Sequence, residues 1–193
     1  MSNPTRIRTA VVPVAEIFEL RRSVLRPGLP PESAVFPEDD APAARTFHVA
    51  AYDEEGAVRA CATFFAEPLP DGVGAGADGA AGSDGAGPAR SAGPGHAAYG
   101  AHAPYGVHAP DGADRAYRFR GMASDPAVRG LGYGVAVLRA GLAEAAARGA
   151  ETVWCNGRTS ARGFYEHQGF TAVGEEFDIE SVGPHHVFVI KVG

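Results

Sequence analysis

The sequence lacks the features that mark several protein classes. It has only two cysteines, Cys61 and Cys155, both in apolar strand-like segments, which are too few for a disulfide framework or a cysteine-based zinc site. We therefore expect buried, reduced thiols and a cytoplasmic protein. No apolar run approaches the length that spans a bilayer, and the first five residues lack the charged and apolar regions of a signal peptide. No membrane partner is expected.

Positive charge is also scarce, and this argues against one class of partner. The chain has 17 Lys and Arg against 23 Asp and Glu, which gives a formal net charge of -6. An acidic surface repels the phosphates of nucleic acids, so nucleic acid binding is not expected as the main function. A local phosphate site remains compatible with this charge, because arginines and backbone amides can bind phosphate in an acidic protein.

Glycine, alanine and proline are abundant, and they concentrate in one segment. Residues 68–113 contain 12 Gly, 13 Ala and 6 Pro among 46 residues. This composition buries too little apolar surface to offset its ordering entropy, so we predict a disordered loop within a single domain spanning residues 1–193. The end of the loop repeats a hexapeptide that starts at His96, His102 and His108. We interpret it as a repeat expansion and expect no metal, because a flexible loop does not preorganise ligands.

Apolar periodicity outside this loop alternates between strand and helix patterns. Strands are predicted at residues 9–12, 47–52, 58–65, 117–123, 152–155, 170–179 and 186–192. Helices are predicted after Pro13 as far as the Arg26-Pro27 stop, after the glycines to about Arg148, and from a Ser160 cap to Gly169. A hairpin followed by strand, glycine turn, helix and strand predicts an α/β fold with a mixed sheet and helices on its faces.

The glycine turn carries the clearest chemistry. The segment Arg129-Gly130-Leu131-Gly132-Tyr133-Gly134 joins a predicted strand to a predicted helix, whose first N–H groups lack intrahelical partners and favour an anion. Glycines allow close approach of a pyrophosphate, and Arg129 can add charge-assisted hydrogen bonds. The spacing matches neither the P-loop nor the dinucleotide fingerprint. On this evidence alone, a tight turn without a ligand is an equally good interpretation.

Two segments together resemble the GCN5-related N-acetyltransferase (GNAT) superfamily. The segment from Met122 to Gly134 is similar to the family's acyl-CoA motif, Gln/Arg-x-x-Gly-x-Gly/Ala, and Phe164-Tyr165-Glu166-His167-Gln168-Gly169-Phe170 resembles its second signature. The resemblance covers the chain outside the loop and is strongest from Tyr117 to Phe170. Three further segments are similar to a bacterial subgroup of the superfamily: 118–123, 154–158 and 183–185.

The resemblance implies a GNAT-like acyl-CoA N-acyltransferase fold and an enzyme. Such an enzyme takes acetyl-CoA as co-substrate and transfers the acetyl group to an amine of a small-molecule or protein acceptor, by direct attack in a ternary complex. The strand before the turn is expected to splay from its neighbour and admit pantetheine. The implied cofactor-binding residues are Met122 and Ser124 for pantetheine, and Val128, Arg129, Gly130, Leu131, Gly132, Tyr133 and Gly134 for the pyrophosphate.

The resemblance also implies a catalytic residue. Tyr165 lies where the family often has a tyrosine near the CoA sulfur, so it is expected to protonate the departing thiolate; the alternative is a packing role. The backbone N–H of Met122 is a candidate donor to the oxyanion. Arg158 occupies a position where the family often has Asn, and it either meets an anionic group or is solvated.

The general base stays open in the sequence. Glu176 and His185 are candidates, and each has a structural alternative, as a solvated residue or as a turn residue. A second interpretation of the whole chain is therefore a non-catalytic module of the same fold that binds or senses acyl-CoA. The sequence does not indicate an oligomeric state.

Overall fold

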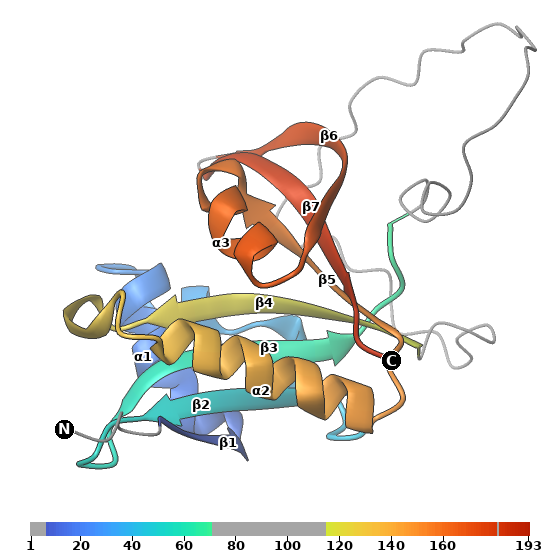
Figure 1. Ribbon diagram of the computed structural model, residues 1–193. Helices are drawn as coiled ribbons and strands as arrows, with labels where there is room; N and C mark the ends of the chain where they lie inside the picture. Colours follow the sequence, from blue (N-terminus) through green and yellow to red (C-terminus); the bar gives the residue numbers. More distant parts are fainter. Residues whose placement is uncertain (1–6, 71–114, 181) are drawn as a thin grey trace, which may run out of the picture.

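A seven-stranded mixed sheet with helices on both faces organises the protein, as a computed structural model shows (Figure 1). The structure describes residues 7–70, 115–180 and 182–193. Nearly all of the predicted loop at 68–113, including the histidine repeat, therefore lies outside the described residues. The strands are β1 (Arg8–Val12), β2 (Thr46–Tyr52), β3 (Val58–Ala66), β4 (Ala116–Ser124), β5 (Thr152–Arg158), β6 (Thr171–Ile179) and β7 (Gly183–Lys191), and their spatial order is β1-β2-β3-β4-β5-β7-β6.

In the described part of the chain, three α-helices and several short 3₁₀ turns complete the fold. The helices are α1 (Val14–Leu25), α2 (Tyr133–Ala147) and α3 (Arg162–His167), and the turns are η1 (Pro31–Ala34), η2 (Pro37–Asp40), η4 (Pro126–Val128) and η5 (Thr159–Ala161). The α/β prediction is confirmed, element by element. One detail is wrong: Ser160 lies inside η5 and does not cap α3, which starts after Ala161 without a side-chain cap. The segments η1 and η2 were not predicted.

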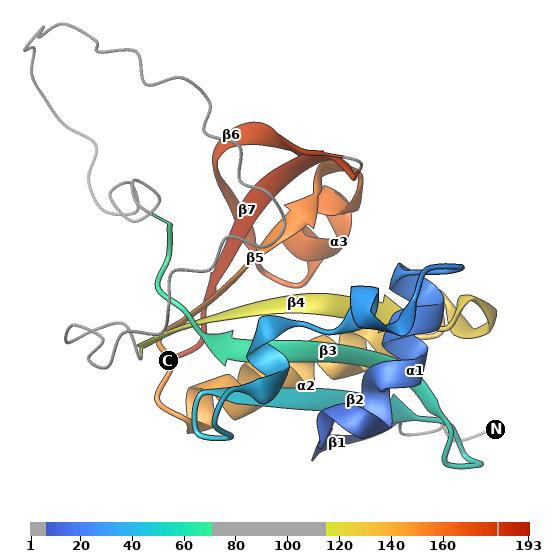
Figure 2. The same ribbon diagram turned by 180° about the vertical axis from the view of Figure 1, so that it is seen from behind.

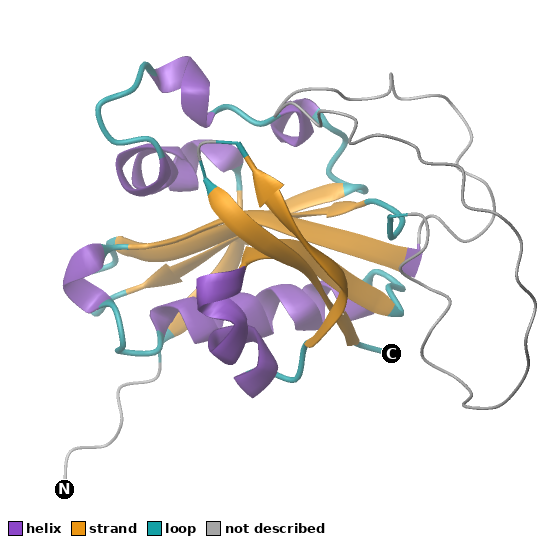
Figure 3. Cartoon of the chain, turned by 90° about the horizontal axis from the view of Figure 1, so that it is seen from above, coloured by secondary structure: helices purple, strands orange, loops and turns teal. Residues whose placement is uncertain are grey.

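Helix layers cover both faces of the sheet (Figure 3). Helix α2 packs on β2, β3 and β4 (Figure 1), whereas α1 and the η1–η2 segment cover the opposite face (Figure 2). The α2 face holds the larger core, and its helix lies very close to the sheet. A Cβ at Gly141 of α2 would stand 2.0 Å from the Phe64 ring, so only glycine allows this approach.

Strand β4 contains an irregularity that matters for the site. The register between β3 and β4 shifts between the pairs Cys61–Ala123 and Thr63–Arg120. Gly121 lies in this bulge with φ 62°, and a Cβ there would meet the Phe36 ring at 2.4 Å. The bulge therefore needs glycine for two reasons, its left-handed backbone and its contact with the segment after α1.

A buried polar network joins α1 to the sheet on the second face. Arg21 of α1 is fully buried, and its guanidinium pairs with Asp39 at 2.7 Å. It also donates to the Ala34 carbonyl at 3.1 Å and to Thr63 Oγ1 at 3.0 Å, and it lies over the Phe36 ring. These contacts fix the η1–η2 segment against β3.

The network ends at His48. Because a histidine titrates near neutral pH, its burial there predicts that the stability of the protein depends on pH. Thr63 Oγ1 accepts from Arg21, so its proton is free to donate to His48 Nδ1, 3.0 Å away, when the imidazole is neutral and Nδ1 is unprotonated. Burial lowers the pKa of His48, the nearby Asp39 carboxylate opposes this shift and the Arg21 charge adds to it. The unfolded chain therefore binds a proton more readily than the folded one.

We expect the melting temperature to fall on acidification below about pH 6.5, the pKa of an unperturbed histidine, and to be unaffected by His48 above it. In His48→Gln the slope of melting temperature against pH should flatten in this acidic range. The exposed His167, replaced in the same way, is the matched control. Equal slopes in wild type and His48→Gln would contradict the assignment.

Candidate functional site

The parallel strands β4 and β5 separate after a short contact, and this opens the centre of the sheet. Only Ala116, Tyr117 and Arg118 of β4 pair with β5, opposite Thr152, Val153 and Trp154. Strand β4 then continues to Ser124 and β5 to Arg158, and the two diverge (Figure 1). Beyond Arg118 the β4 edge that faces β5 has no strand partner among the described residues, so an extended ligand could lie between the strands.

The glycine turn lies at the open end of this gap. After η4, Gly130 and Gly132 adopt left-handed backbones with φ 80° and 92°, which explains why glycine occupies both positions. Gly132 is the N-cap of α2 and provides no side-chain cap. The first intrahelical bond of α2 runs from the Ala136 N–H to the Gly132 carbonyl, so the preceding N–H groups remain available to an anion.

A cavity of about 260 Å³ follows the turn. A Cβ added to Gly134, on the first turn of α2, would lie 3.1 Å from Ser124 Oγ and 3.3 Å from Met122 Cε, so this glycine keeps the space between helix and strand clear. The left-handed glycines, the free helix N–H groups and this cradle fit the pyrophosphate end of an acyl-CoA. The lining residues are Met122, Ser124, Val128, Arg129, Gly130, Gly132, Tyr133, Gly134, Val135 and Phe164.

Tyr165 of α3 lies where β4 and β5 begin to separate. Its ring stacks on Phe188 of β7 at 4.6 Å between centroids and reaches Phe119 of β4 at 6.2 Å. Gly157 of β5 makes room for it, since a Cβ there would stand 2.4 Å from the Tyr165 ring. The hydroxyl lies beside the buried Cys155 thiol, and burial raises the pKa of Tyr165 far above its ordinary value. The phenol is therefore protonated at any physiological pH.

Comparisons with known proteins bear on the family and the fold of this chain. The sequence profile of the Acetyltransferase (GNAT) domain matches residues 96–172. Uncharacterized N-acetyltransferase YitI of Bacillus subtilis (strain 168) is 38% identical over 72 residues, which are 37% of this chain and 48% of that protein, so the match spans about half of that relative. A crystal structure of a proposed N-acetyltransferase from Lactobacillus plantarum aligns over 97% of this chain and 98% of its own, with TM-score 0.62 and 17% identity.

In residues 96–172 and in its fold, this chain is similar to members of the GNAT superfamily. A second solved structure, yncA from Salmonella typhimurium, a proposed acetyltransferase with its cofactor acetyl-CoA, aligns over 98% of this chain and 95% of its own, with TM-score 0.59 and 12% identity. At these identities the structural matches show the fold alone. They confirm the predicted GNAT architecture and leave the activity to be argued from the site.

Most of the predicted cofactor residues meet at one cavity. Eight of the nine line it, and Leu131 does not: its side chain is 65% exposed and only its backbone belongs to the turn. The structure adds Val135 and Phe164, which the sequence analysis did not single out. Phe164 precedes Tyr165 in the second signature. Its place in that motif is the one sequence feature that could have identified it as a cavity residue. Tyr165 itself is absent from the lining and lies deeper, at the strand separation.

The face of the gap opposite α2 carries arginines and one unsatisfied amide. Arg118 pairs with Glu67 at 3.1 Å and lies over the Trp154 ring, and Arg120 is 3.2 Å from the buried Glu38. Trp154 is buried and donates Nε1–H to the Glu67 carbonyl, so it packs within the fold. Asn156 Oδ1 is buried and has no hydrogen-bond partner within the described part of the chain. This face is therefore preorganised by charge pairs, with polar groups still available.

The two candidate bases lie on the β6–β7 hairpin, away from the cavity lining. Glu176 is half exposed and accepts a hydrogen bond from Thr159 Oγ1 at 2.7 Å. His185 is buried, and its Nδ1 lies 2.7 Å from the Gly183 carbonyl, beside the Phe177 ring. Arg158 pairs with His185 in the strand register and is exposed. None of the three lines the cavity.

Other expectations concern metals, thiols and membranes. Cys61 and Cys155 are buried and unpaired, as predicted, and burial raises the pKa of each thiol to about 12. Among the residues that the structure describes, no group of three or more His, Cys, Asp or Glu side chains is placed to hold a metal ion. Within the same ranges no helix is long and apolar enough to cross a membrane.

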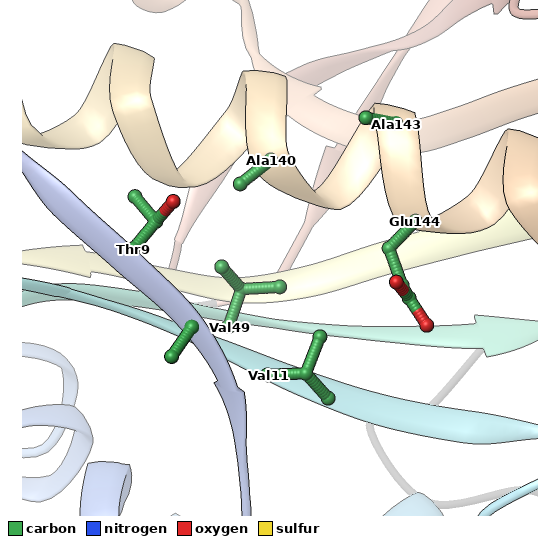
Figure 4. A pocket seen from close by; sticks show the side chains of 7 residues that line it. Thr9, Val11, Val49, Ala140, Ala143 and Glu144 are labelled. Atoms are coloured by element: carbon green, nitrogen blue, oxygen red, sulfur yellow. The ribbon is translucent and has the colours of Figure 1, made fainter.

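A second cavity, of about 340 Å³, lies between β1, β2 and α2 (Figure 4). Its lining is small or aliphatic except for Thr9 and Glu144. It lacks the glycine backbone and the helix N-terminus of the first cavity. We therefore take the β4–β5 gap and the glycine turn as the candidate functional site.

Gly134 gives a direct test of the candidate cofactor site. Gly134→Val should weaken acetyl-CoA binding about 10- to 100-fold, because the new side chain fills the cradle and one or more charge-assisted hydrogen bonds to phosphate are lost. Titration calorimetry measures this. The control is Gly163→Val in α3, where an added Cβ meets nothing within 4 Å. Unchanged affinity in a folded Gly134→Val protein would place the pyrophosphate elsewhere.

Proposed function

We propose that this protein is an N-acetyltransferase that transfers the acetyl group of acetyl-CoA to an amine of a small-molecule or protein acceptor, by direct attack in a ternary complex. The observation that supports this most is the coincidence of two features: the gap between β4 and β5 and the glycine turn at its open end. The gap provides backbone groups for the extended pantetheine arm, and the glycine turn provides N–H groups for the pyrophosphate.

Each group of residues is proposed to bind a different part of acetyl-CoA. Arg129 and the backbone from Val128 to Gly134 hold the pyrophosphate, and the β4 backbone at Met122 and Ser124 aligns the pantetheine arm. Acetyl-CoA supplies an activated thioester. The Met122 N–H, at the β4 bulge, is the candidate donor to the negative charge that develops on the thioester oxygen.

Tyr165 supplies the proton. Its hydroxyl lies beside Cys155, at the point where the strands separate, and it stays protonated because burial raises its pKa. A neutral phenol can donate a proton to a thiolate as it leaves, and cannot act as a base. The acceptor amine must therefore lose its proton to another group or to water on the opposite face, which the arginines and Asn156 line.

A two-stage experiment tests the proposal. Acetyl-CoA should raise the melting temperature of the purified protein in a concentration-dependent way, and thiol release should be measurable with at least one member of a broad panel of amines, including peptide N-termini. Binding without thiol release for any amine would favour the acyl-CoA-binding module instead. No thermal shift with acetyl-CoA would contradict both functions. The two reduced, buried thiols support a cytoplasmic setting for the reaction.

A further inference from the structure

A carboxylate stands at the entrance to the proposed pyrophosphate site. Asp125 is the last residue before η4 and the glycine turn, and its Oδ1 accepts the Ala127 N–H at 2.9 Å as an N-cap. Its pKa is lowered, first by this bond and then by Arg59, so it is ionised at neutral pH. A negative charge beside a site for two phosphates is unfavourable unless another group compensates it.

Arg59 of β3 provides the larger part of that compensation, and the nearby charge of Arg129 in the turn adds a smaller part. Its Nη1 lies 2.6 Å from Asp125 Oδ2, and its carbonyl accepts the Asp125 N–H at 2.8 Å. Its Nε lies 2.5 Å from Asp53 Oδ2, in the turn between β2 and β3, where Asp53 Oδ1 also accepts the Ala57 N–H at 2.7 Å. A row of three charges therefore connects the β2–β3 hairpin to the start of the glycine turn.

We propose that Arg59 is a positioning residue for the acyl-CoA pyrophosphate: it holds the Asp125 cap in place and cancels its charge, so that the turn can accept an anion. The inference rests on the proposed function. Arg59 does not line the cavity, so it acts through Asp125 and not by touching the cofactor. A purely stabilising role explains little, because its side chain is one-third exposed and exposed ion pairs add little to stability.

Three variants separate this positioning role from a purely stabilising role of Arg59. They are Arg59→Met, Asp125→Asn and the double variant. Asparagine still caps η4, because its amide oxygen accepts the Ala127 N–H, but it needs no counter-charge. Each protein is titrated by calorimetry with acetyl-CoA and with S-acetyl-pantetheine, which has the same arm and thioester but no pyrophosphate; displacement by acetyl-CoA is used for the weaker ligand.

We expect Arg59→Met to weaken acetyl-CoA binding about three- to tenfold at low ionic strength, with S-acetyl-pantetheine unaffected, and the double variant to regain most of the loss. Asp125→Asn alone should bind acetyl-CoA at least as tightly as wild type, which tests the same idea if Arg59→Met does not fold. Equal losses for both ligands, a loss that Asp125→Asn does not rescue, or weaker binding by Asp125→Asn alone would each overturn the inference. If wild type does not bind acetyl-CoA, the proposed function falls and the inference with it.

Discussion

Tyr165→Phe is expected to lower kcat about 10²- to 10⁴-fold while leaving acetyl-CoA affinity nearly unchanged. The phenol donates its proton only as the C–S bond breaks, so its loss affects the transition state and not the bound state. The loss falls toward the lower end of this range to the extent that a thiol, with an ordinary pKa of about 8.5, leaves unassisted. Packing is preserved, because phenylalanine keeps the ring that stacks on Phe188.

The measurement is steady-state kinetics with an amine from the screen, together with a direct titration of acetyl-CoA. Tyr52→Phe is the matched control: it also loses a hydroxyl, the one bonded to Glu16, in the α1 core and away from the gap. Because burial raises the pKa of Tyr165, its ionisation should add no alkaline limb to the wild-type pH profile below about pH 10. A near-wild-type kcat for Tyr165→Phe, where chemistry limits turnover, would return the residue to a packing role.

Arg21→Met should produce the largest loss of stability, about 3–5 kcal/mol in the free energy of unfolding, because one partner of a buried ion pair is removed. The Asp39 carboxylate, 6% exposed, would be left without its arginine. Methionine fills much of the same volume, so the loss reports the missing charge and hydrogen bonds more than a cavity. Urea unfolding followed by circular dichroism gives the free energy and the midpoint.

The neighbouring arginine is the matched control for this change. Arg22 pairs with Glu19 one turn away on the exposed side of α1, and Arg22→Met removes the same charge with little expected effect on the unfolding midpoint. The two variants change the same helix, replace the same side-chain type by the same residue and have the same net charge. Similar midpoints for the two variants would show that the buried network does not stabilise the fold.

The sequence predicts the fold well where the pattern is local. Alternation and 3.6-residue periodicity find every strand and α-helix of the described residues. The glycines at 130, 132 and 134 predict the tight turn between β4 and α2, because left-handed backbones at the first two and the close approach of Ser124 at the third require that residue. Arg21 shows the limit. In a helical pattern an arginine is predicted to face solvent, and only the distant Asp39 and Thr63 make its burial possible.

The chemistry of the site is less visible in the sequence for a similar reason. Gly121 lies within a predicted strand and Gly157 lies just after one, and neither pattern predicts a special role, yet each glycine allows an aromatic ring to approach from another element. The cap at Asp125 is a local feature, whereas its pairing with Arg59 joins residues far apart in the chain. Contacts of this kind depend on how strands are ordered in space, which no window of sequence contains.

The separation of β4 from β5 also has a consequence for the lifetime of the protein. Most sheets have two edges. Here the facing sides of β4 and β5 form two more edges in the interior of the sheet, where the peptide groups of the described residues that lack a strand partner can pair with another chain. On the proposed function, acetyl-CoA occupies this gap, and its binding energy adds to the stability of the folded state by mass action. The co-substrate would then act as a folding ligand, and the amount of intact protein would follow the supply of acyl-CoA.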